Sequence, residues 1–90
     1  MTDEAAWRLE FAPRARRDLK RLDPPIARRI LAAIEGLLDD PPTGDRRKLT
    51  DHDDEWRLRV GDWRVRFTRL ADTQVIIIQR VLPRGRAYRD

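Results

Sequence analysis

The stretch "EWRLRVGDWRVRF", residues 55–67, decides the fold of this chain. Large apolar residues alternate with arginine on both sides of a Gly-Asp pair, as in two half-buried strands joined by a tight turn. If Gly61 and Asp62 are the two turn residues, the register of the hairpin follows from them. The predicted cross-strand pairs are Val60 with Trp63, Arg59 with Arg64, Leu58 with Val65, Arg57 with Arg66, and Trp56 with Phe67.

This register divides the hairpin into two chemically different faces. The apolar residues all fall on one face, which can cover a layer of helices. The other face carries arginines as cross-strand pairs of like charge, and each pair should destabilise the sheet by roughly 0.2–1 kcal/mol. Because an anion would relieve this repulsion, we interpret the face as an exposed phosphate-binding surface made by Arg57, Arg59, Arg64 and Arg66. The alternative is that these guanidinium groups stack on one another or pair with Asp54, Glu55 or Asp72.

One strand and two helices are predicted before the hairpin. Apolar residues alternate with charged ones over residues 7–11, which indicates a strand. Pro13 can occupy the first position of a short helix, and Asp23 can cap a second helix that ends before "DDPP" at 39–42. The apolar stripes are Ala15, Leu19 and Leu22 in the first helix, and Ile26, Ile30, Ile34 and Leu37 or Leu38 in the second.

Residues 40–54, "DPPTGDRRKLTDHDD", are rich in turn formers and charge. They predict a connecting loop with a short extended piece at Lys48 to Thr50, and the length of the loop makes it a candidate for function. Strands are expected at 55–60, 63–70 and 74–82. The predicted element order is β-α-α-β-β-β, in a single α+β domain that spans residues 1–90.

Composition excludes several classes of protein. The chain has 90 residues, no cysteine and one histidine, which excludes a disulfide framework and a thiolate metal site and argues against an all-protein zinc centre. We expect no metal and no cofactor. The longest apolar run, "VIII" at 75–78, has the length of a strand, and the N-terminus lacks the layout of a signal peptide. A soluble, cytoplasmic protein with no membrane partner is expected.

The positive charge is concentrated in the C-terminal third. Residues 1–55 hold 11 Lys and Arg against 13 Asp and Glu, a net charge of −2, whereas residues 56–90 hold 9 against 3, a net charge of +6. This asymmetry favours a polyanionic partner, either nucleic acid or an acidic protein segment. The alternative is a basic surface that is merely solvated.

The segment "VIIIQRVLPRGRAYR", residues 75–89, extends the basic pattern. Arg80, Arg84, Arg86 and Tyr88 lie in or near a turn containing proline and glycine, from which their side chains can reach the basic sheet. Tyr88 is the only tyrosine, and it can stack on a base or supply a phenolic proton. Packing against the sheet is the alternative role for this side chain.

Taken together, these features resemble the toxins of the RelE/ParE superfamily, the toxin halves of bacterial toxin–antitoxin pairs. The resemblance covers nearly the whole chain and rests on "RRDLKRLD" at 16–23, "RKLTDHDDEWRLRVGDWRVRF" at 47–67 and "VLPRGRAYR" at 81–89. Its most specific part is the block at 56–65, followed by the R-x-x-x-Y spacing of Arg84 and Tyr88. The resemblance implies a RelE-like fold, with a small antiparallel sheet packed on a helical hairpin.

For the RelE branch, the resemblance implies an endoribonuclease that cleaves messenger RNA in the A site of the 30S ribosomal subunit, without a metal. The 2′-hydroxyl of the substrate attacks the adjacent phosphate, and a basic face stabilises the charge of the transition state. For the ParE branch, it implies a toxin that poisons DNA gyrase without chemistry of its own. A third possibility is a relic that has lost toxicity and only binds its partner.

Residue roles follow from the resemblance by position. Arg57 and Arg59 match two basic residues of the strand before the turn, and Arg64 matches the arginine of a G-x-[YW]-R element. Arg84 falls near the basic residue of the C-terminal segment, which Tyr88 closes. The implied catalytic set is Arg59, Arg64, Arg84 and Tyr88, and the implied RNA-binding set is Arg57, Arg66, Lys48, Arg80 and Arg86.

The general base is a separate question, because arginine stays protonated and cannot accept the proton. The candidates are Tyr88, His52 in the loop and Glu55 beside the hairpin. We prefer Tyr88, since neighbouring arginines would lower the pKa of its phenol.

The resemblance also implies a cognate antitoxin. A flexible antitoxin segment with apolar anchors and acidic residues could wrap the domain and cover its basic region. Promoter DNA would be bound only through the antitoxin.

Overall fold

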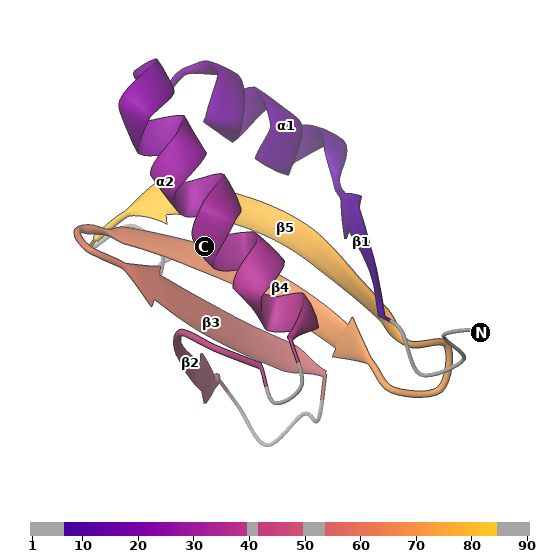
Figure 1. Cartoon of the computed structure of the whole chain (residues 1–90). Helices are drawn as coiled ribbons and strands as arrows, with labels where there is room; N and C mark the ends of the chain where they lie inside the picture. Colours follow the sequence, from indigo (N-terminus) through magenta and orange to yellow (C-terminus); the bar gives the residue numbers. More distant parts are fainter. Residues whose placement is uncertain (1–6, 40–41, 50–53, 85–90) are drawn as a thin grey trace.

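The computed structural model describes residues 7–39, 42–49 and 54–84 (Figure 1). Its elements are β1 (Arg8–Phe11), α1 (Pro13–Lys20), α2 (Pro24–Glu35), the 3₁₀ turn η1 (Gly36–Leu38), β2 (Asp45–Lys48), β3 (Glu55–Val60), β4 (Trp63–Leu70) and β5 (Val75–Pro83). The predicted α+β class is confirmed. The two helices and the three strands of the C-terminal half begin and end within a few residues of their predicted bounds.

The strands form one sheet in the order β1-β5-β4-β3-β2. Two details differ from the prediction. β2 is a fifth strand, which pairs with β3 and replaces the extended piece expected at Lys48 to Thr50. The sheet is mixed, because β1 runs parallel to β5 while the other neighbours are antiparallel. The alternation of apolar and charged residues in β1 could not reveal this direction, since it is the same in both kinds of pairing.

Both helices lie on the same face of the sheet (Figure 1). Each begins with proline in its first turn, as predicted. Asp23 occupies the N-cap position of α2, but its side chain makes no capping hydrogen bond. Ile30, Ile34 and Leu37 are buried, so the predicted stripe of α2 is the surface that packs on the sheet.

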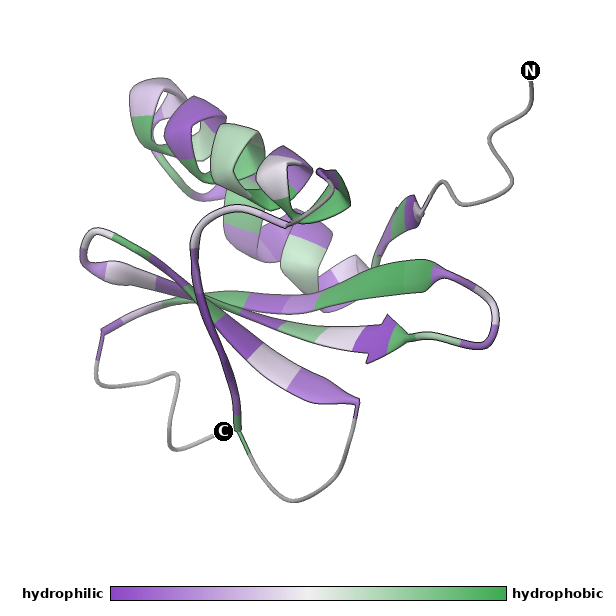
Figure 2. Ribbon diagram, turned by 60° about the horizontal axis from the view of Figure 1, so that its bottom comes forward, coloured by the Kyte–Doolittle hydropathy of each residue, from purple (hydrophilic) through white to green (hydrophobic). Residues whose placement is uncertain are grey.

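The core lies between the helices and the apolar face of the hairpin. Leu58, Val60, Val65 and Phe67 are buried in it, and the rings of Trp56 and Phe67 stack with their centroids 6.2 Å apart. β5 adds Ile76, Ile78 and Val81 to the same core. Hydrophilic and hydrophobic residues alternate along the long strands (Figure 2), which is the pattern of a sheet covered on one face only.

The predicted hairpin register is confirmed at all five cross-strand pairs. Gly61 has a φ of +58°, a positive value that glycine adopts at little cost and that type I′ and type II′ hairpin turns both require at their first central residue. Arg29 of α2 also lies close by, because a Cβ added at Gly61 would come within 2.8 Å of its Nη2 atom. The positive φ explains glycine at this position, since the end of the flexible Arg29 side chain could move aside for a Cβ.

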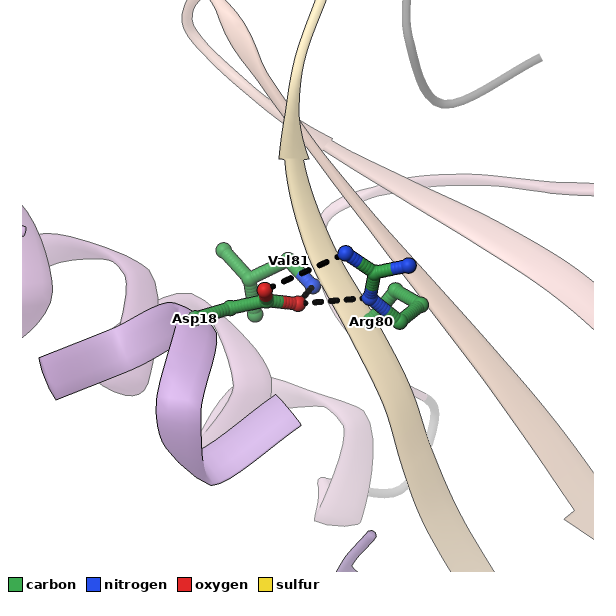
Figure 3. Close-up of polar contacts among 3 residues, drawn as sticks. All are labelled: Asp18, Arg80 and Val81. Carbon is green, nitrogen blue, oxygen red and sulfur yellow. Dashed lines mark hydrogen bonds and ion pairs between the residues drawn. The ribbon is translucent and has the colours of Figure 1, made fainter. Parts of the chain in front are cut away.

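A half-buried carboxylate joins α1 to β5 (Figure 3). Asp18 Oδ2 accepts hydrogen bonds from Arg80 Nε at 2.9 Å and from the Val81 backbone N–H at 2.8 Å. Arg80 Nη2 donates to Asp18 Oδ1 at 3.3 Å. Since β1 pairs with β5 only as far as Ile78, Asp18 satisfies a backbone donor that lies beyond the end of β1.

Candidate nucleic-acid interface

The register places a line of arginines across four strands. Arg47 of β2 is opposite Arg57 of β3, Arg57 is opposite Arg66 of β4, and Arg66 is opposite Arg80 of β5. We call these four residues the arginine row. Paired residues share a face of the sheet, and the neighbours of Arg57 and Arg66 along the strands, Leu58 and Val65, point into the core. Arg47, Arg57 and Arg66 therefore lie on the face opposite the helices, whereas the guanidinium of Arg80 also contacts Asp18 of α1.

Arg59 and Arg64 form a second pair on this face, one step closer to the turn. Asp45 is opposite Arg59 at the β2 edge, and Leu82 is opposite Arg64 in β5. The four hairpin arginines thus share a face, as predicted. Within the described residues none of them forms an ion pair with a carboxylate, so pairing with Asp54, Glu55 or Asp72 does not neutralise them.

The prediction of full exposure was wrong for two of the four hairpin arginines. Arg57 is 8% exposed and Arg64 is 3% exposed, whereas Arg59 is exposed and Arg66 is half-buried. Arg57 has a long side chain on each side, because it stands between Arg47 and Arg66 in the arginine row. The aliphatic parts of the neighbouring arginine side chains shield Arg57 from solvent. The alternation of residues along a strand cannot reveal such shielding.

Arg64 is buried because its side chain folds back on the turn. Its Nη1 donates to the carbonyl oxygens of Gly61, at 3.2 Å, and Trp63, at 3.1 Å. Its Nε is buried and has no hydrogen-bond partner among the described residues. A buried hydrogen-bond donor without an acceptor lowers the stability of the fold. A rearrangement that brought an acceptor to this Nε would therefore lower the free energy.

The other residues predicted for the site do not all lie beside the arginine row. Lys48 is opposite Trp56 and so lies on the helix side of the sheet, where its Nζ is 6.0 Å from the centre of the Trp56 ring; it is not brought together with the arginine row. Arg84 is exposed at the end of β5, and its backbone N–H donates to Asp62, which holds it near the hairpin turn. Arg86, Tyr88 and His52 lie outside the described residues.

A hollow of about 230 Å³ adjoins the arginine row, lined by Ala12, Arg14, Glu55, Arg66, Gln79 and Arg80. Glu55 Oε2 accepts a hydrogen bond from Thr68 Oγ1 at 3.1 Å, and Thr68 Oγ1 accepts one from Gln79 Nε2 at 3.2 Å. Sequence reasoning missed Arg14, Arg47, Thr68 and Gln79. Only the alternation in β3 and β4 could have indicated Thr68, and the others depend on tertiary contacts.

The electrostatics of Asp18 set the charge at one end of the arginine row. Burial raises the pKa of this carboxyl, but hydrogen bonds from Arg80 and Val81 and the charges of Arg80 and Arg14 outweigh it and hold the pKa below its usual value. Asp18 is therefore ionised at neutral pH and offsets the charge of Arg80.

Among residues 7–39, 42–49 and 54–84, no three His, Cys, Asp or Glu side chains gather as a set of metal ligands. In the same part of the chain, no helix combines the length and the apolar content needed to cross a membrane.

Comparison with known proteins identifies the family. A family model described as the ParE toxin of the type II toxin-antitoxin system, parDE, matches residues 9–88. This chain belongs to the RelE/ParE toxin superfamily. The match includes all of the helical hairpin and all of the hairpin that carries the arginines, so the resemblance drawn from those motifs is confirmed.

Relatives of this RelE-like type II toxin agree with that assignment. RelE1 of Methanocaldococcus jannaschii, assigned as a toxin by inference, is 30% identical over 87 residues, which cover 93% of this chain and 97% of the relative. A chain of the archaeal RelE–RelB complex from Pyrococcus horikoshii is 29% identical, with a TM-score of 0.78, and the match covers 90% of this toxin and 98% of that chain. A chain of the toxin–antitoxin complex RelBE2 from Mycobacterium tuberculosis is 25% identical, with a TM-score of 0.74. That match covers 88% of this toxin and 99% of the M. tuberculosis chain.

Proposed function

We propose that this toxin is a metal-independent, ribosome-dependent endoribonuclease that cleaves messenger RNA. The observation that carries the proposal is the arginine row, which continues across four strands: Arg47, Arg57 and Arg66 lie on the face opposite the helices, and Arg80, at the β5 end, contacts Asp18 of α1. Like charges placed directly opposite one another weaken a sheet, and a phosphodiester backbone would turn this repulsion into binding. The toxin would act in the cytoplasm, where its ribosome-bound substrate is found.

The reaction suited to this surface is internal attack of a ribose 2′-hydroxyl on the adjacent phosphate. Negative charge builds on the phosphate oxygens in the transition state, and fixed guanidinium groups stabilise it without a metal. We assign Arg59 and Arg66 to direct phosphate contact, because they are the accessible members of the hairpin set.

The test is cleavage of messenger RNA on ribosomes that carry a defined codon in the A site, with the new 5′ ends mapped. The wild-type toxin should cleave with a chelator present, and Arg66→Glu should abolish cleavage while the domain stays folded. Arg28→Glu is the matched control, because it makes the same charge change at an exposed position of α2, on the opposite layer. Intact messages at every toxin concentration would rule the proposal out.

A ParE-like activity is the second candidate, and the description of the matching family model favours it. In that case the toxin would bind DNA gyrase and carry out no chemistry itself. The same purified protein would then trap gyrase–DNA cleavage complexes and leave messenger RNA intact. The shared fold is compatible with both targets.

A cognate antitoxin is part of either proposal. The solved relatives from P. horikoshii and M. tuberculosis are toxin–antitoxin complexes. We propose that an antitoxin segment with acidic side chains covers the arginine row and blocks access to RNA. Binding to promoter DNA is assigned to the antitoxin, and not to the toxin.

A further inference from the structure

Among the described residues that line the hollow beside the arginine row, one side chain can accept a proton. The lining consists of arginines, an alanine, a glutamine and Glu55. Arginine stays protonated in proteins and an amide is not basic, so the carboxylate of Glu55 is the group in this lining suited to acid–base chemistry.

Glu55 stands next to the proposed phosphate-binding residues. It lies two residues before Arg57 in β3, on the same face of the sheet, and it is opposite Thr68 in β4. Arg66 is therefore its diagonal neighbour across the two strands, and diagonal neighbours of this kind are roughly 7–8 Å apart. A phosphate held by Arg66 would thus lie beside the carboxylate, with the ribose hydroxyl between them.

The carboxylate is held in place on one side only. Oε2 accepts the hydrogen bond from Thr68, whose hydroxyl is in turn bonded by Gln79. Gln79 is the extra residue of the β-bulge, because Arg66 is opposite Arg80 while Phe67 is opposite Ile78. Bulges often re-aim side chains beside active sites. Within the described residues, Oε1 of Glu55 accepts no hydrogen bond, and no arginine forms an ion pair with this residue.

We infer that Glu55 is the general base of this toxin. This inference rests on the proposed ribonuclease function. The carboxylate takes the proton of the ribose 2′-hydroxyl, the 2′-oxygen forms a bond to the adjacent phosphorus, and the bond from phosphorus to the 5′-oxygen breaks. The departing 5′-oxygen keeps the electron pair and takes a proton from water, and Glu55 returns its proton to the solvent. The products are a 2′,3′-cyclic phosphate and a 5′-hydroxyl.

The test compares Glu55→Gln with the wild-type toxin in single-turnover cleavage of ribosome-bound messenger RNA. The cleavage rate at saturating toxin should fall by about 100-fold or more, while the toxin concentration giving half-maximal rate stays the same or falls, since a negative charge is removed. The dependence of the wild-type rate on pH that a general base produces should disappear in the variant. Glu55→Asp should recover part of the rate.

Glu10→Gln is the matched control, because Glu10 is an exposed glutamate of β1 that lies outside the hollow and within 3.9 Å of Arg8. It should cleave at the wild-type rate. Thr68→Val keeps the carboxylate but removes the hydroxyl that orients it, and should lower the maximal rate by a smaller factor. If Glu55→Gln does not fold, the cleavage rates of Glu55→Asp and Thr68→Val, measured over the same pH range, test the role of Glu55 instead.

The outcomes separate the two proposals. If the wild-type toxin leaves ribosome-bound RNA intact, the ribonuclease function fails. If the wild-type toxin cleaves, and the Glu55 and Thr68 variants cleave equally fast with an unchanged pH profile, the ribonuclease function stands and the role of Glu55 is overturned.

Discussion

At the scale of single residues, Asp18 shows how one carboxylate can serve two purposes. Its side chain is 11% exposed, and it accepts hydrogen bonds from the guanidinium of Arg80 and from the backbone of β5. Charge-assisted hydrogen bonds of this kind are roughly twice as strong as hydrogen bonds between neutral groups. Asp18 thereby fixes α1 to the sheet and also holds one end of the arginine row.

Asp18→Asn should destabilise the domain by about 1.5–3 kcal/mol at pH 7, because the charged acceptor is lost. Since folding lowers the pKa of Asp18, its contribution is complete above the unfolded-state value of about 3.9 and is lost as the pH falls through the lower folded-state value. The difference in unfolding free energy between the two proteins should therefore shrink in acid. Urea denaturation at pH 7 and at about pH 3 measures it.

Asp23→Asn is the control for this experiment, since Asp23 is exposed and its side chain caps nothing. A change of less than about 0.5 kcal/mol is expected there. An Asp18 variant as stable as the wild type at pH 7 would contradict the proposed anchor.

The role of Asp18 could not be predicted from the sequence. The helix that contains it was predicted from its proline and its apolar stripe, but the partner Arg80 is 62 residues away. Nothing in a helical pattern distinguishes a carboxylate that faces solvent from one that reaches a distant strand. The burial of Arg64 was missed for a similar reason, because its side chain bonds to the turn instead of extending outward.

At the scale of elements, the β3–β4 hairpin is the part that the sequence predicts best. A turn of two residues leaves a single register, and the apolar alternation determines which face is buried. β2 escaped prediction because its four residues, "DRRK", are all charged and exposed, so no period of two is visible. The arginine row was recognised only in part for that reason, since Arg47 comes from β2.

The arginine row should make the stability of the domain depend on the kind of anion. Inorganic phosphate should raise Tm more than chloride does at the same ionic strength, and a gain of 1 kcal/mol would correspond to about 4–8 °C. Arg66→Thr should reduce this difference, because it removes a central charge of the arginine row. Thermal unfolding followed by circular dichroism in the two salts measures it.

The control for the phosphate effect is Arg28→Thr, which removes an exposed arginine from α2. This variant should respond to phosphate as the wild type does. Equal Tm values for the wild-type toxin in phosphate and chloride would show that the arginine row does not bind phosphate.

At the scale of the whole molecule, the fold consists of a helical layer and a sheet, and the two faces of the sheet have different roles. The helices bury the apolar face of the sheet, and the opposite face is left to carry charge (Figures 1 and 2). The sequence predicted this division through the two faces of the hairpin. It could not predict the hollow beside Glu55, because that site is formed by β3, β4, β5 and the start of α1 together.

A toxin of this design should gain stability from its antitoxin. The proposed antitoxin segment would cover like charges that repel one another in the free toxin, so Tm should be higher for the complex and should rise with antitoxin concentration. Reversing the charge at Arg59 and Arg66 should weaken this effect, and reversing it at Arg28 should not. An antitoxin that leaves Tm unchanged would contradict the expected partnership.

The order of strands in the sheet also bears on when the toxin can act. β5 lies between β1 and β4, although it is made after both of them. While the chain is being translated, β1 has no neighbour to pair with, and neither Arg80 nor Gln79 is in place. A growing copy therefore cannot complete this basic surface until β5 has been synthesised and has joined the sheet between β1 and β4.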